Sequence, residues 1–530
     1  METVNYGQGI AKGDLTGRDR MVSNVLYSWG GYLVFVITGF IMPRMIDGYV
    51  GQTALGIWDF CWSLVSYLSL AGLGVGSSVN RYVAKYRAEN DVLRLRQAVS
   101  SVMGIQVTIA LFIQVGTAVL AWGLPRFFVN RLGTEIGAAQ WVVFFLGSSL
   151  ALEMAFDATK GVITGCHRWD LHNFIHAGSR IISVSGMIIA LLLGGGLRSL
   201  SLVYFFTIVG TEITRVITAF LVCRELRIGL KYAEWGRAKE MLLFGIKTIV
   251  AGLPPFVVVT TSNVLIAGYL GPAALAVFAR PVMLVRHVET FVNKLAFVMT
   301  PTTGSLQGKG RQEDVRRLLI QSTCFGIALT LPIVIILTIF GDVILHLWMG
   351  PKYAVGTVLT ILSLGYLLPV CQSPVLRILM GLNLHGRIGL ISSITSLLTF
   401  ALGILLLKPI GWSLVSGSLL VAISLTVGGG ILVPILACKR LGIAMKSYVR
   451  ESFLVPVLCN AAFAVCLVLV RLVFDGYPVT AFVTGVGSGS LLLTILYWLY
   501  LVPAEKRRAF HEWILTKLGR KQPYQRESVS

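Results

Sequence analysis

The sequence predicts an all-α polytopic membrane protein with about fourteen transmembrane helices. We expect two six-helix bundles related by an internal repeat, followed by two additional helices. The chain has 530 residues, of which 55% are hydrophobic and 13% charged, and its mean hydropathy is +0.78. Soluble domains carry about 25% charged residues. A soluble globular fold is therefore excluded, because too few polar residues are present to cover its surface.

Fourteen apolar stretches are long enough to cross a bilayer as helices, which takes roughly 20 residues. They lie near residues 21–46, 53–80, 98–123, 139–163, 174–193, 200–222, 241–268, 273–300, 319–341, 357–379, 388–407, 413–436, 452–473 and 480–502. The segments between them are short. The longest predicted outward loops, 124–138 and 342–356, have 15 residues each, and the tail 503–530 has 28.

The basic residues between the spans predict the orientation of the chain. With the N-terminus in the cytoplasm, the cytoplasmic segments carry 30 Lys and Arg residues, whereas the opposite side carries five. This split follows the positive-inside rule, so we expect both termini in the cytoplasm. The formal net charge of +21 is explained by these loops, and no nucleic-acid partner is predicted.

A short segment in the first half of the chain reappears 220 residues later. Residues 48–58, GYVGQTALGIW, match residues 268–278, GYLGPAALAVF, with five identities. Each copy forms the tight turn between the first two spans of a six-span unit. The repeat predicts an N-terminal bundle at 1–222, a C-terminal bundle at 223–436, and two further helices with a basic tail at 437–530.

Four segments carry a resemblance to a known family. They are the opening span from Asn24 to Arg44, the turn 48–51 with Ala54-Leu55-Gly56, the stretch Leu73-Gly74 to Asn80-Arg81-Tyr82, and the second turn 268–272. With the fourteen-span plan, the chain resembles the lipid-linked oligosaccharide (O-antigen and polysaccharide) flippases of the multidrug/oligosaccharidyl-lipid/polysaccharide exporter superfamily.

The resemblance implies two bundles around a central cavity that open alternately to the two sides of a bacterial inner membrane. The implied cargo is an undecaprenyl-pyrophosphate-linked oligosaccharide for polysaccharide or lipopolysaccharide export. Membrane lipids are implied partners, and polysaccharide polymerase and ligase proteins are candidate partners. The family keeps few fixed residues, so no catalytic residue is carried over.

Charged residues within the spans are candidates for function, because a charge at the bilayer centre costs about 2.5–3.5 kcal/mol on insertion scales. The ten cations are Arg44, Lys160, Arg180, Arg215, Lys247, Arg280, Arg286, Lys294, Arg377 and Arg471. The five anions are Asp59, Glu153, Asp157, Glu212 and Glu289. Helical spacing places Glu153, Asp157 and Lys160 on one face, at i, i+4 and i+7, and Glu212 with Arg215 at i and i+3, so structural ion pairs are expected in both groups.

The eighth span has the densest charge. Arg280, His287 and Lys294 recur every seven residues, with Arg286 and Glu289 beside them, so a charged stripe follows one face. Guanidinium groups suit a pyrophosphate because they stay ionised and bond bidentately. We expect Arg280 and Arg286 to bind the headgroup, and the predicted substrate-binding set is completed by Lys294, Arg180 and Lys247. The alternative is that the two arginines neutralise Glu153, Asp157 and Glu289.

Those three carboxylates, Glu153, Asp157 and Glu289, are candidates for coupling transport to a proton or a sodium ion, and they serve equally well as counter-ions. The pair Pro254-Pro255 in the seventh span is the hinge candidate, because proline removes a helical hydrogen bond. His172 and His176 lack a third ligand, and no CxxC spacing occurs. We therefore predict no metal site and no cofactor.

Three functions compete. The first is a flippase for a lipid-linked anionic glycan, which needs differential binding to two states and no covalent chemistry. The second is a drug or cation antiporter, which should have an acidic cavity. The third is a membrane enzyme such as a polysaccharide polymerase or ligase, which would need a large outward loop with catalytic groups. The short loops favour a transporter over an enzyme, and a scaffold would leave the buried cations unexplained.

Overall fold

A computed structural model describes residues 21–72, 75–234, 253–297 and 299–505, with a few isolated positions beside these ranges. Every regular element in these ranges is a helix. The chain forms two compact units. Unit 1 comprises Met1–Arg280 with Leu397–Val421, and unit 2 comprises Pro281–Ser396 with Ala422–Ser530.

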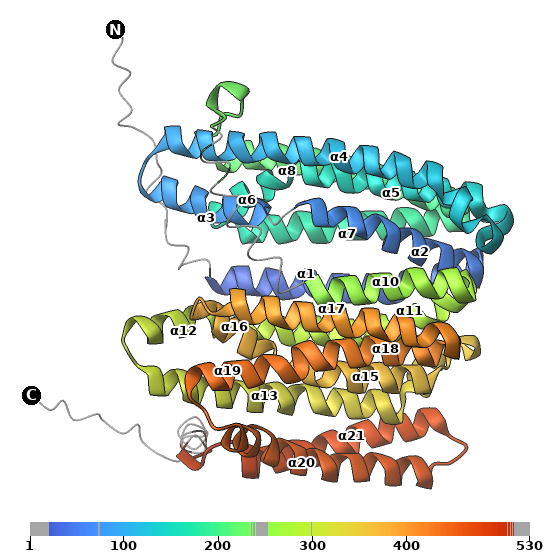
Figure 1. The fold of residues 1–530 in the computed structure, drawn as a ribbon, viewed down its shortest axis with the longest axis vertical. Coiled ribbons are helices and arrows are strands. Elements are labelled where there is room, and N and C mark those ends of the chain that lie inside the picture. The colour runs from blue at the N-terminus through green and yellow to red at the C-terminus, as the bar shows by residue number, and fades with distance from the viewer. Residues whose placement is uncertain are drawn as a thin grey trace, which may run out of the picture. The chain divides into compact units, whose positions relative to one another are not determined.

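Unit 1 contains the first eight numbered helices, α10 and the start of α11. The helices are α1 (Met21–Tyr49), α2 (Gln52–Leu68), α3 (Val75–Ala88), α4 (Val92–Leu132), α5 (Ile136–Ala155), α6 (Asp157–Gly165), α7 (Trp169–Leu192), α8 (Leu197–Val222), α10 (Leu253–Leu270) and α11 (Pro272–Ala296). Helix α4 packs along α5, α1 along α7, and α8 along both α5 and α7 (Figure 1).

Unit 2 contains the rest of α11 and most of the later helices. These are α12 (Met299–Gly308), α13 (Gln312–Ile339), α14 (Gly341–Met349), α15 (Gly356–Cys371), α16 (Ser373–Gly381), α17 (His385–Ile410), α18 (Leu414–Leu425), α19 (Val433–Leu441), α20 (Met445–Val473) and α21 (Pro478–Leu496). Parts of α17 and α18 belong to unit 1. The two C-terminal helices, α20 and α21, form a hairpin, and α20 packs along α13 (Figure 1).

The prediction of an all-α polytopic membrane protein is confirmed. Within the described residues, twelve stretches are long and apolar enough to cross a membrane. One of them, residues 92–155, contains both α4 and α5. Helix α11 is outside the twelve, because Arg280, Arg286, Glu289 and Lys294 interrupt its apolar sequence. The number of fourteen spans stays a prediction.

Three spans that we expected to be continuous helices are interrupted. The expected span 53–80 divides into α2, a 3-10 turn at Ser69–Gly72 and α3. The span 139–163 breaks at Phe156, and the span 357–379 breaks at Gln372, just before Ser373-Pro374. Apolar periodicity does not register such a break, since both sides remain apolar. The fourth span of each repeat is broken in the same way, which supports the internal repeat.

Side chains from neighbouring helices hydrogen-bond to residues at two of these breaks. The fully buried Gln106 of α4 accepts a hydrogen bond from the backbone N–H of Ala158 at 2.9 Å. At the other break, the Tyr448 hydroxyl donates to Gln372 Oε1 at 2.7 Å. Hydrocarbon supplies no hydrogen bonds, so an interrupted helix at membrane depth requires such partners.

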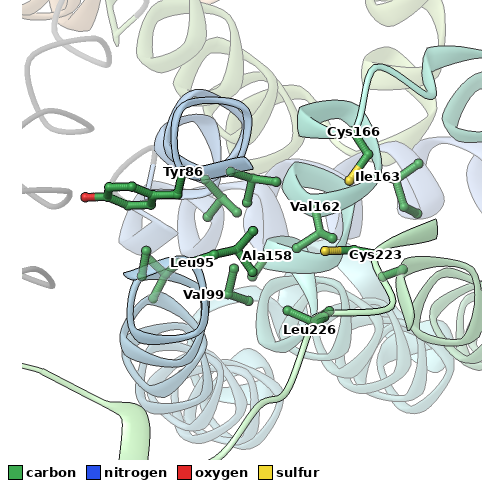
Figure 2. Packing of buried hydrophobic residues seen from close by; sticks show 14 residues of the cluster. Tyr86, Leu95, Val99, Ala158, Val162, Ile163, Cys166, Cys223 and Leu226 are labelled. Carbon is green, nitrogen blue, oxygen red and sulfur yellow. The ribbon is translucent and has the colours of Figure 1, made fainter. Parts of the chain in front are cut away.

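A buried apolar cluster joins the ends of α3, α4, α6 and α8. Figure 2 shows Val99, Ala158, Val162 and Cys223 gathered within it. The hydrogen bond with Cys166, together with burial, raises the pKa of the Cys223 thiol. The thiol therefore stays protonated at neutral pH, which suits its apolar surroundings.

The two copies of the repeated turn have the same backbone geometry. Gly51 has φ 99° between α1 and α2, and Gly271 has φ 93° between α10 and α11. Only glycine adopts this conformation without strain. Five residues after the first turn, a Cβ on Gly56 would overlap the carbonyl carbon and oxygen of Pro272. The beginnings of α2 and α11 are therefore in backbone contact.

Substitution of Gly56 tests this contact. We expect Gly56→Ala to destabilise the protein by about 1–3 kcal/mol, because the obstructing atoms are backbone and cannot rotate away. The matched control is Gly48→Ala, where the added methyl meets nothing within 4 Å. Thermal unfolding in detergent should show a lower midpoint for Gly56→Ala than for Gly48→Ala. Equal midpoints would contradict the close approach of the two helices.

Candidate functional site

The interior of unit 1 holds several of the charges singled out in the sequence. Lys160 Nζ lies 2.9 Å from Asp157 Oδ1 on α6, so this part of the pairing predicted from helical spacing is present. Glu153 lies on α5, before the break at Phe156, and forms no salt bridge within the described residues. Gln106 Nε2 donates to Asp157 Oδ2 at 3.5 Å. One carboxylate of the ion-coupling set thus has a cation and an amide as neighbours, at the point where α5 ends and α6 begins.

The second predicted pair, Glu212 with Arg215, is deeply buried on α8. The two side chains are 2% and 5% exposed and form a salt bridge. Glu212 Oε2 and Arg215 Nε have no hydrogen-bond partner within the described part of the chain. His172 and Lys160 interact electrostatically with this pair. The pair therefore neutralises itself while keeping unused polar atoms.

Arg180 of α7 is held by groups other than a carboxylate. Its Nε donates to Thr38 Oγ1 of α1 at 3.2 Å, and its guanidinium lies 5.6 Å from the centre of the Phe35 ring. Tyr204 of α8 interacts electrostatically with both Arg180 and Glu153. In the described ranges, no carboxylate lies within ion-pair distance of Arg180. Its positive charge is left available to a ligand.

Arg280, at the end of unit 1, forms a salt bridge with Asp59 of α2. The arginine side chain is 3% exposed and the aspartate side chain 19% exposed. Asp59 is one of the five anions expected within the spans, and its sequence context predicted no role for it. Asp59 could have been singled out, because it is the only acidic residue in its expected span. Its pairing with Arg280 could not be predicted, since the two residues are separated by 221 positions in the chain.

The remaining charges of α11 belong to unit 2. Arg286 is exposed, whereas Glu289 and Lys294 are partly buried. Tyr366, buried on α15, interacts electrostatically with both Arg286 and Glu289. Arg286 forms no salt bridge in the part of the chain that the structure describes. An exposed guanidinium therefore sits beside a carboxylate and a tyrosine midway along an apolar helix.

The sequence-predicted set is thus distributed over both units. Glu153, Asp157, Arg180 and Arg280 are in unit 1, and Arg286, Glu289 and Lys294 are in unit 2. Lys247 lies outside the described residues. Pro254 and Pro255 lie in α10. Their role as a hinge stays a prediction.

The sequence did not single out four neutral polar residues that interact with these charges, because such residues are common in apolar helices. They are Thr38, Gln106, Tyr204 and Tyr366.

These features define a class: a many-helix membrane transporter fold with breaks and buried charges inside its spans. The polysaccharide biosynthesis protein family matches residues 90–358, just over half of the chain. This protein belongs to that family, as the sequence resemblance predicted. It is also similar to an uncharacterised membrane protein of Methanocaldococcus jannaschii, with 22% identity over 66% of this chain and 70% of the relative.

Solved structures show the same fold. The lipid II flippase MurJ in an inward closed conformation aligns with a TM-score of 0.66 at 12% identity, over 90% of this chain and 98% of its own. An inward-facing multidrug resistance MATE transporter aligns with 0.63 at 15% identity, over 79% and 94%. A transporter of the same superfamily from Pyrococcus furiosus, described as having a binding pocket of reverse polarity, aligns with 0.59 at 15% identity, over 81% and 96%.

The buried pair on α8 can be compared with an exposed pair. We expect Glu212→Gln to destabilise the protein by about 3–5 kcal/mol, because Arg215 would keep an uncompensated charge. Asp342 pairs with Arg471 at 2.8 Å, with both side chains about two-fifths exposed. Asp342→Asn should cost about 0–1 kcal/mol. Thermal unfolding of both variants in detergent measures the difference, and equally small shifts would mean that Arg215 is not sealed from water.

Proposed function

We propose that this protein is a flippase that moves a lipid-linked oligosaccharide across a bacterial cytoplasmic membrane by alternating access. The proposed substrate headgroup is a pyrophosphate joined to an undecaprenyl-type lipid. One observation supports this more than any other: Arg286 keeps an exposed guanidinium midway along an apolar helix of 25 residues. Such a charge is expensive in hydrocarbon, so it serves an aqueous or ligand-filled space.

A guanidinium is suited to this headgroup. It remains charged at all relevant pH values and presents parallel N–H donors that match the oxygens of a phosphate. Arg280, with Lys294, Arg180 and Lys247, completes the proposed set of headgroup ligands. Lysine acts as a point charge, so the lysines would add attraction with less directional preference.

The proposed mechanism needs no covalent step. The polar headgroup enters a cationic cavity while the lipid tail stays in the bilayer, and the protein alternates between two states with different affinity for it. In this scheme the bundles at 1–222 and 223–436 rock against each other, and the helices of 437–530 are additional. The proposed location has both termini in the cytoplasm. Polysaccharide polymerase and ligase proteins are proposed as partners that use the exported lipid.

A drug or cation antiporter is the second candidate, because the fold is shared with MATE transporters. The charges favour the flippase. Arg180 and Arg286 form no salt bridge within the described ranges, and both would repel a cationic drug. The reverse-polarity pocket described for the Pyrococcus furiosus transporter makes a change in charge within this fold a reasonable proposal.

Substitution of Arg286 tests the substrate. In liposomes containing a labelled lipid-linked oligosaccharide, we expect Arg286→Ala to lower the transfer rate at least tenfold, because a charge-assisted hydrogen bond contributes about 1.5–3 kcal/mol. The transfer rate of Arg286→Lys should lie between those of the unchanged protein and Arg286→Ala, since lysine keeps the charge but not the bidentate geometry. The control is Arg471→Ala, which removes a cation from a half-exposed pair. Full transfer by a folded Arg286→Ala protein would remove Arg286 from the site.

The carboxylates of unit 1 test ion coupling. We expect transfer by the unchanged protein to accelerate under an imposed proton or sodium gradient, and the acceleration to disappear in Asp157→Asn and Glu153→Gln. A neutral amide keeps the size of the side chain but cannot exchange a proton or balance a sodium ion. Glu313→Gln, on the exposed surface of α13, is the control. An undiminished response in both variants would assign these carboxylates to counter-ion roles.

A further inference from the structure

One face of α2 carries a stripe of small and polar residues. Gln52, Gly56, Asp59, Ser63 and Tyr67 recur at intervals of three or four, so they share one side of the helix. We call the contacts of this face with α10 and the start of α11 the polar seam. All of its members lie in unit 1.

Half of the polar seam joins α2 to α10. The hydroxyl groups of Tyr67 and Thr261 are 2.6 Å apart, and Asn263 Nδ2 donates to Ser63 Oγ at 3.1 Å. These are neutral hydrogen bonds that water can replace. They hold α2 against α10, and water can take their place when the two helices separate.

The other half joins α2 to the beginning of α11. Gln52 Nε2 donates to the carbonyl oxygen of Ala273 at 3.0 Å, and the missing side chain of Gly56 admits the backbone of Pro272. Both sides of this contact come from the repeated turn, the first copy supplying Gln52 and Gly56 and the second Pro272 and Ala273. The seam therefore joins equivalent positions of the two repeats.

The salt bridge between Asp59 and Arg280 is the charged member of the polar seam. It differs from the hydrogen bonds around it, because separation would leave a guanidinium without a counter-ion in a low-dielectric interior. Arg280 Nε and Nη1 have no hydrogen-bond partner within the described residues, although the side chain is 3% exposed. Arg280 thus holds one carboxylate and retains two unused donors.

We infer that Arg280 is the gating ligand of the transporter: Asp59 occupies it while the polar seam is closed, and a phosphate of the substrate replaces Asp59 as the seam opens. The inference rests on the proposed function, because alternating access requires the two repeats to separate on the side of their turns. Once the seam opens, the two unused donors and the position left by the carboxylate can receive phosphate oxygens. A neutral or cationic molecule offers no replacement for Asp59.

This exchange makes opening conditional on an anionic headgroup. A ligand shifts a conformational equilibrium only through its different affinity for the two states. In the closed state Arg280 is already neutralised, whereas in the open state it needs an anion. The phosphate therefore binds the open state better, which supplies the required difference.

Hydrogen exchange of the full-length protein in detergent tests the seam without a label. We expect Asp59→Asn to accelerate amide exchange about tenfold in residues 52–68 and 272–280, because the closed state loses the partner of Arg280. The matched control is Asp342→Asn, which removes a carboxylate from a half-exposed pair. Exchange at the seam unchanged by Asp59→Asn would overturn the inference.

A ligand experiment tests the exchange of counter-ions. Undecaprenyl pyrophosphate should accelerate exchange in the same two segments of the unchanged protein, and undecaprenol, which lacks phosphate, should not. The double variant Asp59→Asn/Arg280→Gln has no unpaired charge, so it should fold, keep its seam and lose the response to undecaprenyl pyrophosphate. A response that persists in this variant, or that undecaprenol also produces, would overturn the role of Arg280.

The flipping assay separates this inference from the proposed function. The protein could transfer lipid-linked oligosaccharide in liposomes while undecaprenyl pyrophosphate has no effect on hydrogen exchange at the polar seam. That result would support the flippase function and reject the gating role of Arg280. Loss of transfer for all lipid-linked glycans tested would reject the flippase itself.

Discussion

A charged group at membrane depth must be neutralised or hydrated, because hydrocarbon offers neither counter-ions nor hydrogen bonds. This constraint organises the interior of the protein. Asp157 has Lys160, Glu212 has Arg215, and Asp59 has Arg280. The same constraint applies to the backbone, since the N–H of Ala158, just after the break at Phe156, donates to the buried Gln106 of α4.

Once these pairs are accounted for, Arg180 and Arg286 remain without a salt bridge in the described part of the chain, and so do Glu153 and Glu289. Arg180 rests against a hydroxyl and an aromatic ring, and Arg286 is exposed beside Glu289. Membership of the polysaccharide biosynthesis protein family and the fold shared with MurJ and MATE transporters fit a role in moving a polar cargo through the membrane.

The two copies of the internal repeat carry part of this electrostatic arrangement. The two copies of the Gly-Tyr-X-Gly turn adopt the same left-handed glycine conformation, and the fourth span of each copy is broken. The two copies are in contact at the polar seam, where water can replace most of the hydrogen bonds. Water cannot replace the salt bridge between Asp59 and Arg280 in the same way. A contact that is weak except for one ion pair is suited to control by a competing anion.

Much of the fold could be predicted from the sequence, because the hydrophobic effect acts on composition and periodicity alone. The apolar runs specified the helices, the Gly48–Trp58 match specified the repeat, and spacing along one helix specified the pairs Asp157–Lys160 and Glu212–Arg215. The helix breaks were not predicted, because apolar residues lie on both sides of each break.

Pairing between distant segments was decided only by the tertiary structure. Arg280 was expected to bind a headgroup or to neutralise Glu153, Asp157 or Glu289, and it pairs with Asp59 of α2. Spacing defines neighbours within a helix, where the geometry is fixed at 3.6 residues per turn. Spacing carries no information on which face of another helix packs against these residues. The sequence by itself therefore determined which charged residues lie within the helices, and the contact of α2 with the beginning of α11 determined the partner of Arg280.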